Sequence, residues 1–115
     1  MKLPNIFEKE SPLLTILAGG TVFAEGQPAE YMYLVKKGQV EILKDGRVLE
    51  TVGRDGFFGE LALVDAQARS ATARAKTDCE LATINEKQFL FMVGETPFFA
   101  LTVIRAMAAR LRRKD

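Results

Sequence analysis

The sequence contains no histidine, no tryptophan and only one cysteine, Cys79. Without histidine, the chain lacks the commonest general base, the histidine ligands of cupin-type metal sites and an axial histidine for haem. A lone cysteine forms neither an internal disulfide nor a thiolate cluster for zinc or an iron–sulfur centre, and we expect a small strand residue without chemistry. Since the usual tools of an enzyme are absent, we predict a non-enzymatic protein that holds no metal and no cofactor.

An excess of charge of one sign and long apolar runs are also missing. The 16 basic and 15 acidic residues give a net charge of +1, so we expect no broad basic field and no direct binding of nucleic acid. No apolar stretch approaches the roughly 20 residues that span a bilayer, and residues 1–4 are not followed by the apolar run of a secretory signal. We therefore expect one cytoplasmic domain, 1–115, without membrane contact.

Short apolar segments alternate with turn residues between residues 20 and 85, which is typical of a β-sandwich or barrel. We place strands at residues 21–24, 31–36, 40–43, 48–52, 72–76 and 80–84. The Asp45-Gly46 pair predicts a hairpin between two of them. The strand at 31–36 has two faces, formed by Tyr31, Tyr33 and Val35 and by Met32 and Leu34. We interpret its tyrosines as half-buried strand residues and not as a platform for stacking a base.

Helical signals lie at both ends of this region. Ser11-Pro12, followed by four apolar residues up to Leu17, predicts an N-terminal helix that Gly19-Gly20 ends. At the other end we expect a short helix over residues 86–93, before Gly94, and a longer helix from about Pro97 to Arg113. The apolar surface of the longer helix covers about 220° of an ideal helix, whereas packing on one surface needs roughly 100°. This helix therefore has room for two partners.

Three groups of residues in these C-terminal helices have different expected roles. A seam with the three–four spacing of paired helices is formed by Leu101, Ile104, Ala108 and Leu111. An aromatic group expected in the core around the hinge consists of Phe89, Phe91, Phe98 and Phe99. A basic group is expected to be a solvated helix end, with a weak contact to an acidic partner as the alternative: Arg110, Arg112, Arg113 and Lys114.

The most informative segment runs from Phe58 to Ala75, because it combines a glycine, a carboxylate, a helical turn and an arginine. Gly59 lets the backbone pass close to a ligand, and the free N–H groups at the start of the turn Leu61-Ala62-Leu63 suit an anion. Arg69 offers a phosphate a fixed fork of charged donors, and Ser70 adds a hydroxyl and a backbone N–H. Glu60 would repel a phosphate beside it, so we expect it to accept a hydrogen bond from a ribose 2′-hydroxyl.

This segment resembles the phosphate-binding cassette of the cyclic nucleotide-binding domain family, and the resemblance runs from about Gly20 to about Arg113. It is carried by Gly-Glu-Leu-Ala-Leu with Arg-Ser-Ala at this spacing. Further matching segments are Glu25-Gly26-Gln27-Pro28-Ala29, Tyr33-Leu34-Val35 with Gly38, and Asp55-Gly56-Phe57-Phe58-Gly59. One departure is Ala68, which stands where many members have proline, so the cassette loop is expected to be less rigid.

The resemblance implies an eight-stranded, mainly β double-sheet jelly roll at about 20–85, with an N-terminal helix and two C-terminal helices at about 86–113. It also implies a set of ligand-binding residues: Gly59, Glu60, Leu61, Ala62, Arg69 and Ser70. Within that set, Glu60 would bind the ribose, while Arg69 and the backbone N–H of Ala62 would bind the phosphate. Ser70 stands where bacterial cyclic AMP receptors often carry serine, whereas threonine is associated with cyclic GMP.

We therefore expect a signalling module that binds a cyclic mononucleotide, with cyclic AMP preferred over cyclic GMP. The long helix would cover the base on one side and meet a second copy of itself on the other, giving a homodimer, and ligand would reposition it. The module would act on a downstream protein that the sequence does not identify. One alternative is an interaction module of the same fold that no longer binds nucleotide. Another is the sensor fragment of a longer transcription regulator, although no helix-turn-helix follows the long helix before Asp115.

Overall fold

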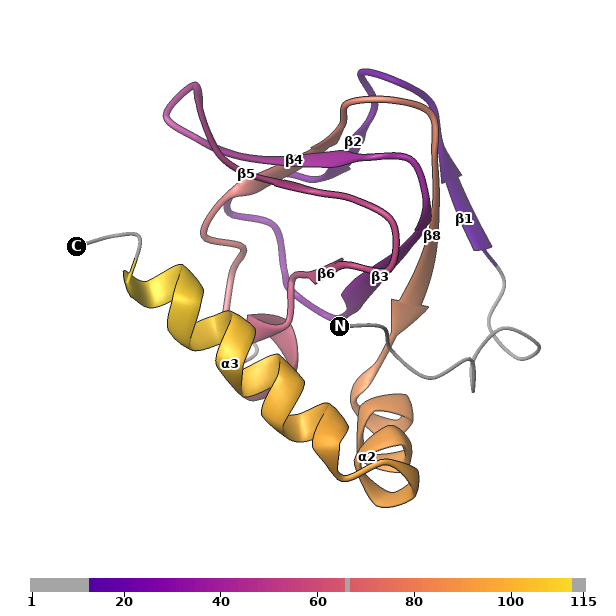
Figure 1. Cartoon of the computed structure of the whole chain (residues 1–115). Coiled ribbons are helices and arrows are strands. Elements are labelled where there is room, and N and C mark those ends of the chain that lie inside the picture. Colours follow the sequence, from indigo (N-terminus) through magenta and orange to yellow (C-terminus); the bar gives the residue numbers. More distant parts are fainter. Residues whose placement is uncertain (1–12, 66, 113–115) are drawn as a thin grey trace.

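The computed structural model describes residues 13–65 and 67–112 (Figure 1). The described strands form two four-stranded sheets, in the orders β1-β8-β3-β6 and β2-β7-β4-β5. Their bounds are β1 Leu13–Ile16, β2 Thr21–Phe23, β3 Met32–Lys37, β4 Val40–Lys44, β5 Arg47–Val52, β6 Phe57–Phe58, β7 Thr72–Ala75 and β8 Cys79–Ile84. A short helix, α1 (Leu61–Asp65), connects the two sheets, and α2 (Glu86–Glu95) and α3 (Phe98–Arg112) follow β8. The predicted mainly β, double-sheet jelly roll is confirmed.

The prediction of a helix at the start of the chain is wrong for Leu13–Ile16. These residues form β1, which pairs antiparallel with β8 from Leu13 opposite Ala82 to Ile16 opposite Cys79. Strand β8 would otherwise leave a row of unpaired backbone groups at this side of the sheet, and β1 covers them. The pairing is long-range, so the local helix signal could not reveal it. Ser11 and Pro12, where the helix was predicted to begin, lie outside the described residues.

Strand β3 separates two apolar clusters, as its predicted alternation requires. On one face Tyr33 and Val35 pack between the sheets, and Tyr33 stacks on Phe58 with ring centroids 5.2 Å apart. On the other face Met32 and Leu34 join a cluster with α2 and α3. Cys79 is buried in the first cluster, consistent with its predicted place as a small strand residue. The helices are therefore held to the sandwich through the second face of β3.

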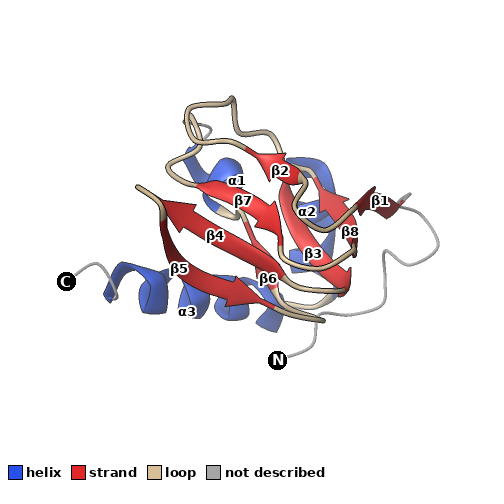
Figure 2. Cartoon of the chain, turned by 90° about the horizontal axis from the view of Figure 1, so that it is seen from above, coloured by secondary structure: helices blue, strands red, loops and turns tan. Residues whose placement is uncertain are grey.

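Helices α2 and α3 have the expected order, with small differences. Helix α2 begins at an Asn85 cap whose side chain accepts from the backbone N–H of Gln88, and it continues through Gly94 to Glu95. Helix α3 runs across the end of the sandwich beside β5 and β6, as the turned view in Figure 2 also shows.

The predicted aromatic core at the hinge is only partly correct. Phe99 is buried and contacts Phe89, with ring centroids 5.2 Å apart. In contrast, Phe91 and Phe98 are 49% and 72% exposed. The periodicity of each helix turns these two rings away from the sandwich, so they do not belong to the core.

Candidate ligand-binding site

The backbone of Arg69 is anchored by the loop that follows β2. The N–H of Gly26 donates to the carbonyl of Arg69 at 2.8 Å, and the N–H of Arg69 donates to the carbonyl of Gln27 at 2.8 Å. This pairing aims the Arg69 side chain into the sandwich, where it is only 7% exposed. Its guanidinium carbon lies 3.9 Å from the centroid of the Phe23 ring and 5.7 Å from that of Tyr33. Aromatic faces therefore support the cation.

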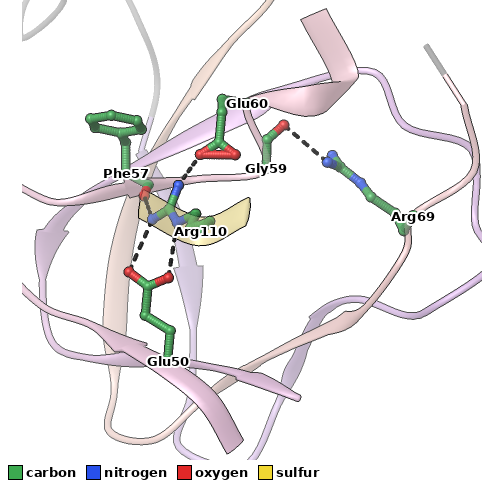
Figure 3. A network of polar contacts seen from close by, with 6 residues as sticks. All are labelled: Glu50, Phe57, Gly59, Glu60, Arg69 and Arg110. Atoms are coloured by element: carbon green, nitrogen blue, oxygen red, sulfur yellow. Dashed lines mark hydrogen bonds and ion pairs between the residues drawn. The ribbon is translucent and has the colours of Figure 1, made fainter. Parts of the chain in front are cut away.

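Among the described residues, no carboxylate pairs with the charged side chain of Arg69, whose polar contacts include two backbone carbonyls. Nη2 donates to the carbonyl of Tyr31 at 2.6 Å and Nη1 donates to the carbonyl of Gly59 at 3.2 Å, the second of which Figure 3 shows. Nε is buried and has no hydrogen-bond partner. Burial lowers the pKa of Arg69, and the nearby Tyr33 hydroxyl partly offsets this effect. A buried cation whose neighbours are carbonyls, aromatic rings and a tyrosine hydroxyl is placed to receive an anion.

Gly59 lies directly against the guanidinium of Arg69. Its φ of +76° is in the left-handed region, and an added Cβ would lie 2.9 Å from Nη1 of Arg69. Glycine is therefore required both for the turn and for the close approach of the arginine. Helix α1 begins two residues later, and the N–H of Ala62 donates to the carbonyl of Gly59 at 3.2 Å. That carbonyl thus fastens the arginine to the start of α1.

The other predicted site residues lie around this pair with different degrees of burial. Ala62 is buried and Leu61 is 49% exposed. Ser70 is exposed next to Arg69, and its carbonyl accepts from Nζ of Lys44 at 3.1 Å. The structure therefore brings Gly59, Arg69 and Ala62 together, while Leu61 and Ser70 lie at the rim.

Glu60 is buried, at 4% exposed, and its side chain meets a residue that the sequence did not point to. Nη1 of Arg110, from the last turn of α3, donates to Oε1 of Glu60 (Figure 3). The prediction that Arg110 belongs to a solvated helix end is therefore wrong. A signal was present, because Arg110 follows Phe99, Val103 and Ala106 at spacings of four, three and four, which places it on the inward stripe of the helix.

Glu50, on β5, is a second carboxylate bound to Arg110 that sequence reasoning missed. Nε of Arg110 donates to Oε1 of Glu50 at 2.8 Å, and Nη2 donates to Oε2 at 3.1 Å and to the carbonyl of Phe57 at 2.7 Å. Glu50 lies two residues before the buried Val52, so strand alternation places both on the inner face. A charged residue at an otherwise apolar inner position was the available signal.

A groove of about 680 Å³ lies beside this ion-pair network, between residues 50–57 and one face of α3. Its α3 wall consists of Thr102, Arg105, Ala106 and Arg110. Among the described residues, no group of three or more His, Cys, Asp or Glu side chains is placed to hold a metal ion. None of the described helices has the length and apolar character needed to cross a membrane.

Two curated proteins are similar to the chain over most of its length. A "CRP-like cAMP-activated global transcriptional regulator" of Mycobacterium tuberculosis is 32% identical over 102 residues, which is 84% of this chain and 46% of the relative. A "cAMP-dependent protein kinase regulatory subunit" of Schizosaccharomyces pombe is 37% identical over 78 residues, which is 67% of this chain and 19% of the relative. The chain thus spans less than half the length of these two relatives.

The chain is also similar to solved structures of an activator protein and of an enzyme. The catabolite activator protein of Thermus thermophilus superposes with a TM-score of 0.79 at 30% identity, covering 91% of this chain and 52% of that one. The cAMP-bound form of the EAL enzyme Bd1971 has a TM-score of 0.66 at 33% identity, covering 88% of this chain and 28% of that one. Its cGMP-bound form gives 0.68 at 34%, with 90% and 29% covered. The family model "Cyclic nucleotide-binding domain" matches residues 13–96. The chain belongs to the cyclic nucleotide-binding domain family.

Proposed function

We propose that this chain binds a cyclic mononucleotide as a regulatory, non-enzymatic signalling module. The observation that carries the proposal is the Arg69 guanidinium, which is 7% exposed, held by carbonyls and rings, and left with an unpartnered Nε. Folding has already removed most of the water around this cation, so that cost does not arise again when a ligand binds. A cyclic phosphate with one negative charge therefore gains most of the electrostatic attraction to Arg69 as binding free energy. The arrangement thus favours an anionic ligand at Arg69.

The remaining predicted contacts are assigned around that phosphate. Glu60 accepts from the ribose 2′-hydroxyl, and Ser70, at the exposed rim, contributes its hydroxyl to the phosphate. The N–H of Ala62 donates to the carbonyl of Gly59 at 3.2 Å, and we assign this N–H to the phosphate when the ligand is bound. At Gly59 and Leu61 the backbone comes close to the ligand. We expect Glu60→Ala to lose affinity for cyclic AMP but not for 2′-deoxy cyclic AMP, and equal losses would remove Glu60 from the ribose contact.

Cyclic AMP is the ligand that we propose over cyclic GMP. Both curated relatives are described by their dependence on, or activation by, cAMP, whereas the EAL enzyme Bd1971 has been solved with either nucleotide. Ser70 supports cyclic AMP, because the family resemblance associates threonine at this position with cyclic GMP. A cytoplasmic location suits such a ligand and stays a prediction.

Ligand binding is proposed to reposition α3. Arg110 connects this helix to Glu60, so a ribose that contacts Glu60 changes the surroundings of the helix end. The helix moves only if the ligand binds one position of α3 more tightly than another. The expected seam is available for a homodimer, because Leu101, Ile104 and Leu111 are 41%, 57% and 65% exposed. A second copy that covers these side chains would bury apolar surface that the single chain leaves in water.

Isothermal titration with cyclic AMP and cyclic GMP tests the function. We expect saturable binding of both, with the lower dissociation constant for cyclic AMP. An interaction module that has lost its ligand would show no heat and no change in melting temperature with either nucleotide. That outcome would overturn the proposed function. A longer transcription regulator would bind nucleotide in the same way, and the mass of the natural gene product distinguishes it from a single-domain protein.

A further inference from the structure

Arg110 divides its guanidinium between two carboxylates. The edge formed by Nε and Nη2 grips both oxygens of Glu50, at 2.8 and 3.1 Å. The bond to Glu60 uses one donor, Nη1, and one oxygen, Oε1. Glu50 therefore has the two-point geometry that makes arginine–carboxylate pairs strong, and Glu60 has a single-point contact (Figure 3).

The network lies largely out of water. Glu60 has a side chain that is 6% exposed, and those of Arg110 and Glu50 are 22% and 27% exposed. Ion pairs in such surroundings are screened less than surface pairs. If Glu50 lost its charge, Glu60 would be the carboxylate left for Arg110 in this network, and the guanidinium would gain by turning its fork onto both oxygens of Glu60.

We propose that Glu50 is a positioning residue for the ribose contact. By holding the Nε–Nη2 edge of Arg110, it limits Arg110 to one oxygen of Glu60 and leaves Oε2 to accept the ribose 2′-hydroxyl. Glu50 thus acts on sugar recognition through Arg110, without touching the ligand. This inference deepens the proposed function and rests on it, since it concerns the same site.

The charge of Glu50 has a second effect that the test must separate. Removing one negative charge near the site favours any anionic nucleotide, with or without its 2′-hydroxyl. The ratio of the two affinities, for cyclic AMP and for 2′-deoxy cyclic AMP, cancels that general effect. A merely structural role of Glu50 would also change both affinities together and leave the ratio unaltered.

The experiment compares this ratio in the wild type, Glu50→Gln and Glu41→Gln by isothermal titration. Glu41 is the matched control, because it also pairs with an arginine, Arg74, at 3.3 Å, but on β4 and away from Arg110. In the wild type we expect cyclic AMP to bind at least about tenfold more tightly than its 2′-deoxy analogue, as a hydrogen bond to a charged group provides. Glu50→Gln should reduce this preference to about threefold or less, while Glu41→Gln should keep it.

An unchanged preference in Glu50→Gln would overturn the role of Glu50 while leaving the proposed function intact. Absence of binding of either nucleotide to the wild type would instead overturn the proposed function, and the inference with it. Glu50→Thr provides a second neutral variant with a residue that suits a strand, in case the glutamine variant folds poorly. It should lower the preference to the same extent.

Discussion

Replacing Arg69 by alanine removes the cation on which the proposed phosphate contact depends. The folded protein holds this side chain 93% buried, since it is 7% exposed, and its two carbonyl partners already fix the fork. Truncating one partner of a buried charge pair costs about 2–5 kcal/mol of binding free energy. At about 1.4 kcal/mol per tenfold change, we expect the dissociation constant for cyclic AMP to rise from roughly 30-fold to several thousand-fold.

The matched control is Arg74→Ala, five residues further along the chain. It removes the same charge, but its side chain is 47% exposed and pairs with Glu41 at 3.3 Å. Exposed pairs of this kind contribute about 0–1 kcal/mol, so we expect Arg74→Ala to change nucleotide affinity by less than about fivefold. Isothermal titration measures both variants, and circular dichroism verifies that both are folded. Equal, small effects of the two substitutions would refute a phosphate contact by Arg69.

Gly59→Ala and Gly46→Ala share a left-handed φ, +76° and +77°, so each should cost about 1–2 kcal/mol of unfolding free energy. Only Gly59→Ala should also weaken nucleotide binding, because its Cβ would lie 2.9 Å from Nη1 of Arg69, whereas nothing lies within 4 Å of a Cβ at Gly46. Equal nucleotide affinities of the two variants would contradict this. Burial raises the pKa of Tyr33 above 10.0, so the folded state holds the proton more tightly than the unfolded state, and stability should fall as the pH rises past about 10. Denaturant titrations should show a smaller fall for Tyr33→Phe than for the wild type, and an equal fall would contradict this. Ile104→Glu, at a side chain 57% exposed on α3, should convert a dimer to a monomer in sedimentation, while the unfolding free energy of the monomer, measured at low protein concentration, changes by no more than about 0.5 kcal/mol. A wild type that stays monomeric at high concentration would refute the dimer.

Features whose signals are local could be predicted from the sequence. Asp45 and Gly46 have positive φ values of 53° and 77°, and they join β4 to β5 as their residue types require. The two faces of β3 follow directly from its alternating side chains, and the helical turn after Glu60 was expected from its composition. In each case the residues that decide the structure lie within a few positions of one another.

Features that depend on distant pairing could not be predicted in this way. Leu13–Ile16 form a strand because β8, far along the chain, offers its edge. The contacts of Arg110 with Glu50 and Glu60 join residues that are 60 and 50 positions apart. The spacing of Arg110 after Phe99, Val103 and Ala106 places it on the inward stripe of α3, but it does not reveal that Glu50 and Glu60 are its partners.

The most direct measurement is the structure of this chain determined with saturating cyclic AMP. We expect the cyclic phosphate within hydrogen-bond distance of the Arg69 guanidinium and the ribose 2′-hydroxyl within hydrogen-bond distance of the Glu60 carboxylate. A nucleotide bound elsewhere, or a phosphate that Arg69 does not contact, would contradict it.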